Sequence, residues 1–186
     1  MALTQSNMFP LGSKAPDFTL TDVVSQKKMT LSQQSQAKAT LIMFICNHCP
    51  YVKHIIGKLV SVAGHYRQLG VAVYAICSND AEAYVADNPA NMSQFAVQHH
   101  FSFPYLYDET QQVAINYDAA CTPDFYIFDE QLLLAYRGRF DQATPGNTSE
   151  VTGHDLCQAI DALLAGEPIS PHQFPSIGCN IKWKNQ

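Results

Sequence analysis

The stretch LIMFICNHCPYVKHII, Leu41–Ile56, joins two patterns of hydrophobicity at a pair of cysteines. The segment Lys38–Cys46 is almost entirely apolar, which predicts a central strand covered on both faces. Apolar residues recur at helical spacing from Tyr51 to Leu69, which predicts a helix. Cys46 and Cys49 are therefore expected where a buried strand passes into a helix.

The remaining sequence alternates between strand and helix patterns. Further strands are expected at 15–23, 71–78 and 103–108 and as a hairpin at 124–129 and 132–140, and further helices at 92–100, 109–118 and 153–166. The first of these strands is expected at a sheet edge, and Asp108 is expected to cap the helix that follows it. This order predicts an α/β, thioredoxin-like arrangement of a central mixed sheet flanked by helices. We expect one domain, 1–166, with an irregular C-terminal tail, 167–186, packing on it.

Composition limits the class of protein. The 186 residues are 47% hydrophobic and 15% charged, which suits a globular domain. The net charge of −5 and the lack of a Lys/Arg run argue against nucleic-acid binding. No basic segment followed by an apolar one opens the chain, and its longest apolar run, 39–46, is too short for a bilayer. We therefore predict a cytoplasmic protein with reduced thiols and no membrane partner.

The position of the Cys46-Asn47-His48-Cys49 motif favours redox chemistry. Sites in open α/β sheets form at the carboxyl ends of strands, and a helix start offers unpaired N–H groups and a positive dipole end. These features predict a lowered pKa for the Cys46 thiol and make it the nucleophile. Cys49, one turn further along, is placed to resolve a mixed disulfide at Cys46. A cationic His48 would stabilise the thiolate further.

Two alternative roles for the paired cysteines stay open. They can be buried structural thiols, or they can bind zinc or copper together with His54. No second CxxC and no histidine pair completes a set of four ligands, so no metal is assigned. A c-type haem attachment is excluded because Pro50 stands where its histidine would be needed.

A second element of interest is CTPDFYIFD, which begins at Cys121. The Thr122–Pro123 bond directly precedes a predicted strand and is a candidate cis peptide, although a trans proline can also open a strand. The fold would bring Cys121 to the same sheet edge as the dithiol. Cys179 lies in the tail after Gly178, which permits a sharp turn. Cys121 and Cys179 are therefore candidate accessory redox thiols.

These motifs together resemble the thioredoxin-like superfamily. The resemblance is carried by KATLIMFIC, CNHC, the helix that follows and TPDFYIFD, and it extends over residues 9–166. Within the superfamily, LGSKAPDFTLTDV and LSQQSQAKATLIMFI resemble the redoxin branch that includes the alkyl hydroperoxide reductase/thiol-specific antioxidant (AhpC/TSA) family. The family resemblance implies Cys46 as the attacking cysteine, Cys49 as the resolving one and Pro123 as the cis-proline that faces them.

The resemblance also implies how substrate binds. Thr122, with Asn47 and His48, would contact the substrate. A histidine beside the second cysteine resembles the more oxidising members of the superfamily. The peroxidases of this branch keep Thr or Ser three residues before the peroxidatic cysteine, and here Met43 stands three before Cys46.

We therefore predict an enzyme, a thiol–disulfide oxidoreductase with a redox-active Cys46–Cys49 disulfide and no organic cofactor. Its substrates would be protein or small-molecule thiols, disulfides or hydroperoxides, and its electron donor a dithiol protein. A thiol-dependent peroxidase and a non-enzymatic copper- or zinc-binding protein are the alternatives. Cys77 and Cys157 are expected to be inert core residues.

Overall fold

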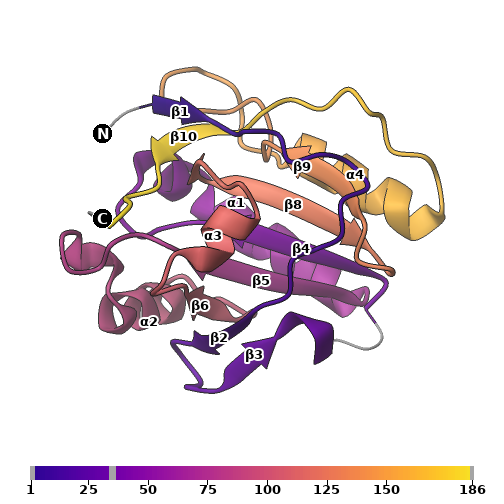
Figure 1. Cartoon of the computed structure of the whole chain (residues 1–186). Coiled ribbons are helices and arrows are strands. Elements are labelled where there is room, and N and C mark those ends of the chain that lie inside the picture. Colours follow the sequence, from indigo (N-terminus) through magenta and orange to yellow (C-terminus); the bar gives the residue numbers. More distant parts are fainter. Residues whose placement is uncertain (1–2, 34–36, 185–186) are drawn as a thin grey trace.

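A seven-stranded mixed sheet forms the centre of the computed structural model, which describes residues 3–33 and 37–184. Its strand order is β3-β2-β6-β5-β4-β8-β9 (Figure 1). The strands are β2 (Thr19–Asp22), β3 (Lys28–Thr30), β4 (Ala39–Phe44), β5 (Val71–Cys77), β6 (Tyr105–Tyr107), β8 (Asp124–Asp129) and β9 (Leu134–Gly138). The predicted mixed α/β sheet is confirmed. The outer limits of the predicted domains, residues 1 and 186, lie outside the described residues.

Four α-helices and two short 3₁₀ helices accompany the sheet in the described part of the chain. They are α1 (Pro50–Gln68), α2 (Pro89–Gln98), α3 (Gln112–Asn116), α4 (His154–Ala165), η1 (Leu31–Gln33) and η2 (Val85–Asp87). None of these helices among the described residues is long and apolar enough to cross a membrane.

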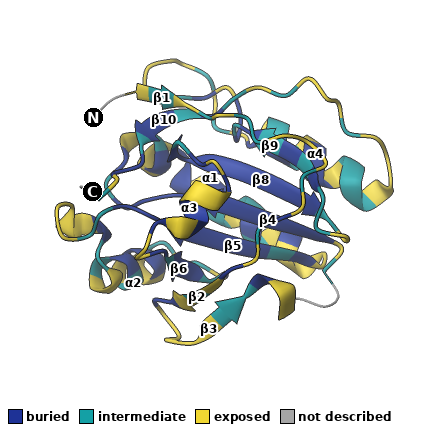
Figure 2. Cartoon of the chain, in the orientation of Figure 1, coloured by how far each residue is buried: buried dark blue, intermediate teal, exposed yellow. Residues whose placement is uncertain are grey.

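Strand β4 lies in the middle of the sheet, parallel to β5 and antiparallel to β8. All six of its residues are buried, and the central strands are dark along their length in Figure 2. Side chains alternate between two cores because strand residues point to opposite faces. Leu41 and Met43 pack with α1, α2 and α4, whereas Ile42 and Phe44 pack with α3 and the N-terminal segment. This double burial explains the continuous apolar run.

Two local predictions were wrong. Strand β2 is not at the edge, because β3, a strand that the sequence analysis did not predict, pairs with its outer side. The helix after β6 is only five residues long and is entered from Gln111, whose φ is 62°, rather than capped by Asp108. Asp108 instead accepts hydrogen bonds from the Ser78 hydroxyl and the Ala114 amide.

A second, three-stranded sheet brings both ends of the chain together. Its order is β1 (Leu3–Gln5), β10 (Ile177–Asn180) and β7 (Cys121–Thr122), all antiparallel. Strand β1 is not predicted by the sequence pattern, and β10 lies within the tail that was expected to be irregular. Figure 1 shows β1 and β10 side by side, near the start of α1 and outside the main sheet. The structure thus places part of the C-terminal tail directly beside the strand that precedes Pro123.

Gly178 allows this close approach of β10 to β7. A Cβ atom at Gly178 would lie 2.0 Å from the Thr122 carbonyl oxygen and 2.7 Å from its carbon. The expectation of a sharp turn at Gly178 was wrong, because the residue lies within a strand. The glycine is needed for contact between two backbones rather than for a turn.

Candidate active site

The two thiols of the CxxC motif lie against Thr122. Cys46 follows β4, and its sulfur is 3.3 Å from the Thr122 hydroxyl oxygen. Cys49 is the N-cap residue of α1, and its sulfur is 3.1 Å from the Thr122 carbonyl oxygen. The Thr122–Pro123 bond is cis, as the sequence predicted. The fold therefore brings together Cys46, Cys49, Thr122 and Pro123 from segments more than 70 residues apart.

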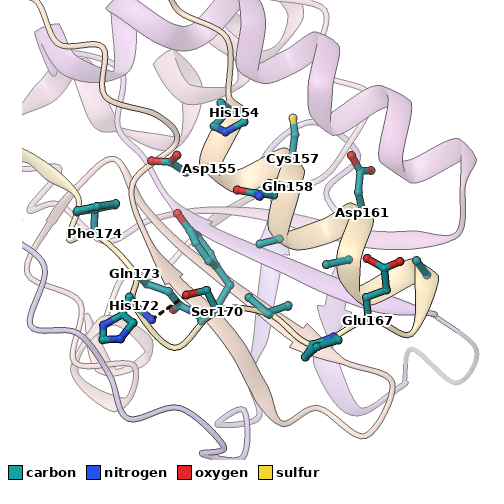
Figure 3. A pocket seen from close by; sticks show the side chains of 16 residues that line it. His154, Asp155, Cys157, Gln158, Asp161, Glu167, Ser170, His172, Gln173 and Phe174 are labelled. Atoms are coloured by element: carbon teal, nitrogen blue, oxygen red, sulfur yellow. Dashed lines mark hydrogen bonds between the residues drawn. The ribbon is translucent and has the colours of Figure 1, made fainter.

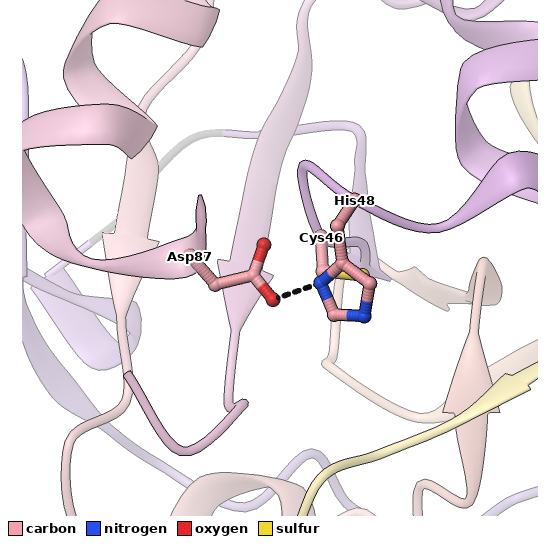
Figure 4. A group of neighbouring side chains, drawn as sticks. All are labelled: Cys46, His48 and Asp87. Atoms are coloured by element: carbon pink, nitrogen blue, oxygen red, sulfur yellow. Dashed lines mark hydrogen bonds and ion pairs between the residues drawn. The ribbon is translucent and has the colours of Figure 1, made fainter. Parts of the chain in front are cut away.

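Between the two cysteines, Asn47 and His48 are fixed by Asp87 of η2. The Asp87 carboxylate accepts the Asn47 amide at 2.8 Å, the Asn79 side-chain amide at 2.7 Å and a 2.6 Å contact from His48 Nδ1. Figure 4 shows the carboxylate directed at the imidazole. Burial opposes ionisation of Asp87, yet these hydrogen bonds outweigh it and lower its pKa. These hydrogen bonds anchor Asn47 and His48 of the motif to the buried Asp87 carboxylate.

Other contacts complete this network. The Asn47 side chain donates to the Ala86 carbonyl at 2.7 Å and accepts from the Tyr105 hydroxyl at 3.0 Å. The His48 ring stacks on Tyr84, with centroids 5.4 Å apart and an angle of 12°. Asn47 and His48, predicted to bind substrate, are therefore engaged by the protein itself. None of Asn79, Tyr84, Asp87 and Tyr105 was predicted from the sequence.

A third thiol adjoins the pair. Cys179 Sγ lies 2.9 Å from Cys49 Sγ, and both side chains are buried. Cys121, the other accessory candidate, is buried in β7, where its thiol contacts the Pro123 carbonyl at 3.7 Å. Burial raises the pKa of Cys121 above its ordinary value. Of the two accessory candidates, Cys179 is the one in direct contact with the CxxC motif.

The charges on the thiols differ from the sequence prediction. The hydrogen bond with Cys49, burial and the charge of Asp87 raise the pKa of Cys46. The pKa of Cys49 is lowered to about 5, mainly by its hydrogen bond with Cys46 and further by Cys179, although burial opposes this shift. The Cys49 thiol is placed to donate to the Thr122 carbonyl, which favours its protonated form, whereas its contacts with Cys46 and Cys179 lower its pKa. We place the first thiolate on Cys49 because the contacts with these two thiols outweigh the carbonyl and burial.

The helix start accounts for this correction. Because α1 begins at Pro50, the N-cap position belongs to Cys49 and not to Cys46. The positive end of the helix dipole then lies next to Cys49. The pKa of Cys46 is raised rather than lowered as expected, first by the hydrogen bond with Cys49, then by burial and by the charge of Asp87, and Cys46 lies three positions before the cap.

The site is closed by its own chain. Cys46 is only 1% exposed and Cys49 is fully buried. Extended chains often bind by adding to a strand edge, but one edge of β7 is already paired, with Cys179 opposite Thr122. A cavity of about 320 Å³ borders Pro123 and the first turns of α1 at Tyr51 and Ile55. Cys46, Cys49 and Thr122 do not line this cavity, which approaches the site through Pro123, the residue after Thr122.

A larger cavity, of about 620 Å³, lies elsewhere, between α4 and the segment that follows it (Figure 3). His154, Cys157, Asp161 and Glu167 line it, and none of the CxxC residues does. Its size alone does not make it the active site, because the paired thiols of the CxxC motif lie near the start of α1. Cys157, which is half-buried, is one of its lining residues, and burial raises the pKa of Cys157.

The ligand set proposed for a metal is not assembled. His54 is exposed on α1, whereas Cys46, His48 and Asp87 lie within 4.8 Å of one another. Both Asp87 oxygens already accept hydrogen bonds from protein groups. Metal binding there would have to displace these donors, so the donor set fits a metal poorly.

The fold and the paired thiols define a thioredoxin-like redoxin. The family model for AhpC/TSA matches residues 11–137, more than half of the chain, and the chain belongs to this family of thiol-dependent oxidoreductases. No curated protein matches the sequence. Cys179 lies beyond the matched residues, so family membership carries no information about it.

Solved structures agree with this fold. An uncharacterized conserved protein from Geobacillus kaustophilus is 53% identical, with a TM-score of 0.98 over 100% of this chain and 98% of that one. A hypothetical protein from Sinorhizobium meliloti is 45% identical, with a TM-score of 0.96 over 98% and 100%. The thioredoxin domain of a thiol-disulfide oxidoreductase from Bacteroides vulgatus is 14% identical, with a TM-score of 0.64 over 83% and 98%, and shows the fold alone.

Proposed function

We propose that the protein is a thiol–disulfide oxidoreductase in which Cys46 attacks the substrate and Cys49 resolves the mixed disulfide. The observation that carries this proposal is the juxtaposition of two hydrogen-bonded thiols with Thr122, whose hydroxyl meets Cys46 and whose carbonyl meets Cys49. Pro123 follows directly and borders the adjoining cavity. A pair of structural thiols would not need this arrangement.

Proton transfer within the pair reconciles the attack with the raised pKa of Cys46. The Cys49 thiolate accepts the Cys46 proton along their hydrogen bond as Cys46 attacks a substrate sulfur. The substrate disulfide breaks, and its leaving thiolate takes a proton from solvent. Cys49 then loses its proton and attacks Cys46, which forms the Cys46–Cys49 disulfide and releases the second substrate thiol. A dithiol donor returns the pair to the reduced form.

The geometry favours small substrates over extended protein chains. Strand β10 occupies the edge of β7 that an incoming chain would pair with. The 320 Å³ cavity beside Pro123 has the size of a small-molecule site. We therefore propose a low-molecular-weight disulfide as the substrate, bound in the cavity that Pro123 and Tyr51 line.

The test uses reduced full-length protein with a small disulfide, a protein disulfide and a hydroperoxide in parallel, each with a dithiol donor. We expect turnover of the small disulfide, and Cys46→Ser should lower it by more than about a hundredfold. Cys49→Ser should accumulate a mixed disulfide at Cys46, and Cys157→Ser, remote from the pair, should match the wild type. Turnover of hydroperoxide alone would instead identify a peroxidase.

Two further outcomes would overturn the proposal. Retained turnover in Cys46→Ser would remove that residue as the nucleophile. An inactive wild type that binds one equivalent of Zn²⁺ or Cu⁺, lost in Cys46→Ser, would favour the metal-binding alternative.

A further inference from the structure

Three cysteine thiols lie together at the site, and Cys49 interacts with both of the others. Cys49 is hydrogen-bonded to Cys46 on one side, and its sulfur is 2.9 Å from Cys179 Sγ on the other. The contact spans 130 residues of sequence. A disulfide between Cys49 and Cys179 would require their sulfurs to approach by only about 1 Å. Cys49 therefore has two adjacent disulfide partners.

The position of Cys179 is fixed by the backbone. In the β10–β7 pairing Cys179 lies opposite Thr122 and Asn180 opposite Cys121, and on its other side β10 pairs with β1. The tail is held further on, where the Lys182 amide donates to Asn79 Oδ1 at 2.8 Å. The Asp80 amide also donates to the Lys182 carbonyl at 2.8 Å. Strand pairing and these hydrogen bonds therefore hold Cys179 in contact with Cys49.

We propose that Cys179 is a third redox thiol, which exchanges with the Cys46–Cys49 disulfide to form a Cys49–Cys179 disulfide and regenerate Cys46. The inference rests on the proposed function and extends the reaction of the same site.

The exchange balances without an external oxidant. The Cys179 thiolate attacks Cys49 Sγ, so that the Cys49–Cys179 bond forms and the Cys46–Cys49 bond breaks. The electron pair of the broken bond leaves on Cys46. In net terms the proton lost by Cys179 ends on Cys46. One disulfide is replaced by another, and the chain keeps its overall oxidation state.

Local charges allow this exchange in the oxidised form. In the reduced site, burial and the hydrogen bond with Cys49 raise the pKa of Cys179 to about 12, whereas Lys182 acts in the opposite direction. Oxidation of Cys49 removes the thiolate that holds the Cys179 proton. The nearby Lys182 ammonium remains to favour a Cys179 thiolate. Oxidation of the pair thus removes the two contributions of Cys49 that raise the Cys179 pKa, whereas burial continues to raise it.

The product separates the two roles of the motif. With Cys49 bound to Cys179, Cys46 is again a thiol and can attack a second substrate sulfur. The oxidising equivalent is stored in a bond between α1 and β10. Reduction by the donor must then act on a disulfide that includes the tail strand.

The test oxidises full-length Cys46→Ser with glutathione disulfide and maps the products after alkylation. We expect one intramolecular disulfide, Cys49–Cys179, with a mass loss of two hydrogens and at least about tenfold more of it than of glutathione adduct at Cys49. The matched control, Cys46→Ser with Cys179→Ser, should carry the adduct at Cys49 instead. Cys46→Ser with Cys157→Ser should still form the disulfide.

An adduct at Cys49 with an unmodified Cys179 thiol in Cys46→Ser would overturn the inference. If Cys46→Ser does not fold, the wild type oxidised by one equivalent is mapped instead, and absence of the Cys49–Cys179 peptide overturns it. Cys179→Ser distinguishes the two proposals. If it still forms the Cys46–Cys49 disulfide and turns over, the proposed function stands whatever the fate of Cys179. If it forms no such disulfide, the proposed function fails.

Discussion

Gly178→Ala should loosen β10 without altering any thiol. The added Cβ would meet the Thr122 carbonyl oxygen at 2.0 Å and Pro123 Cδ at 3.2 Å. Two of the clashing atoms are backbone in a paired strand, so a change of rotamer cannot relieve the overlap. Overpacking of this kind costs about 1–3 kcal/mol. At roughly 2–4 °C per kcal/mol for a chain of this size, the melting temperature should fall by several degrees.

The assay pairs this variant with Gly57→Ala. Gly57 lies within α1 and is exposed, with nothing within 4 Å of an added Cβ. Alanine there should raise the unfolding free energy by about 0.5–1 kcal/mol, because glycine is unfavourable in a helix interior. Urea unfolding of both variants gives effects of opposite sign, and Cys46 should be alkylated faster in Gly178→Ala alone. Unchanged stability of Gly178→Ala would refute the argument that β10 depends on backbone contact with Thr122.

The further predictions concern three buried ionisable groups: Asp87, Cys49 and Asp124. Asp87→Asn should lower the free energy of unfolding by about 1–3 kcal/mol, because donors such as His48 lose their acceptor. The Asp87 pKa is lowered in the fold, so the difference in stability from wild type should vanish as the pH falls through that pKa. A difference that stays constant in acid would contradict this. The same variant should lower the pKa of Cys46, seen as thiolate absorbance at lower pH. The pKa of Cys49 is about 5, against 9.0 for an ordinary thiol. The free energy of unfolding of the reduced protein should therefore rise between about pH 5 and 9 and fall again as the pH is lowered. Cys49→Ser should abolish this pH dependence, as measured by urea unfolding at a series of pH values. Burial raises the pKa of Asp124 to about 7, so the stability that the protonated Asp124 gives the fold is lost as the pH rises from about 4 to 7. The melting temperature of Asp124→Asn should therefore rise relative to wild type over that pH range. A constant difference between the two melting temperatures would count against this prediction.

Regular elements with strong hydrophobic periodicity were predicted well from the sequence. The buried run of β4, the helical period of α1 and the hairpin of β8 and β9 each reflect a local pattern that burial imposes. The candidate cysteines and the Thr122–Pro123 pair were also identified, because their chemistry is visible in short motifs.

The features that were not predicted depend on contacts between distant residues, which the spacing of residues in the sequence does not indicate. Asp87 reaches His48 across 39 residues from a polar, turn-rich segment, and nothing in that segment distinguishes it from an ordinary exposed acid. Strand β10 has four residues, one of them a glycine, and it is defined by its partners rather than by its own propensity. The thiolate position was missed because it depends on the residue at which α1 begins.

The cover formed by β10 also has a consequence for biosynthesis. The ribosome releases the N-terminal part of a chain first, so the CxxC motif and the whole main sheet emerge before β10 is made. Contacts between distant residues are also the slow ones to form. The nascent protein therefore passes through a period in which Cys46 and Cys49 lack Cys179 and its strand. During that interval the dithiol is most accessible to cellular oxidants and to foreign thiols, so errors in disulfide pairing should arise during synthesis more than in the finished molecule.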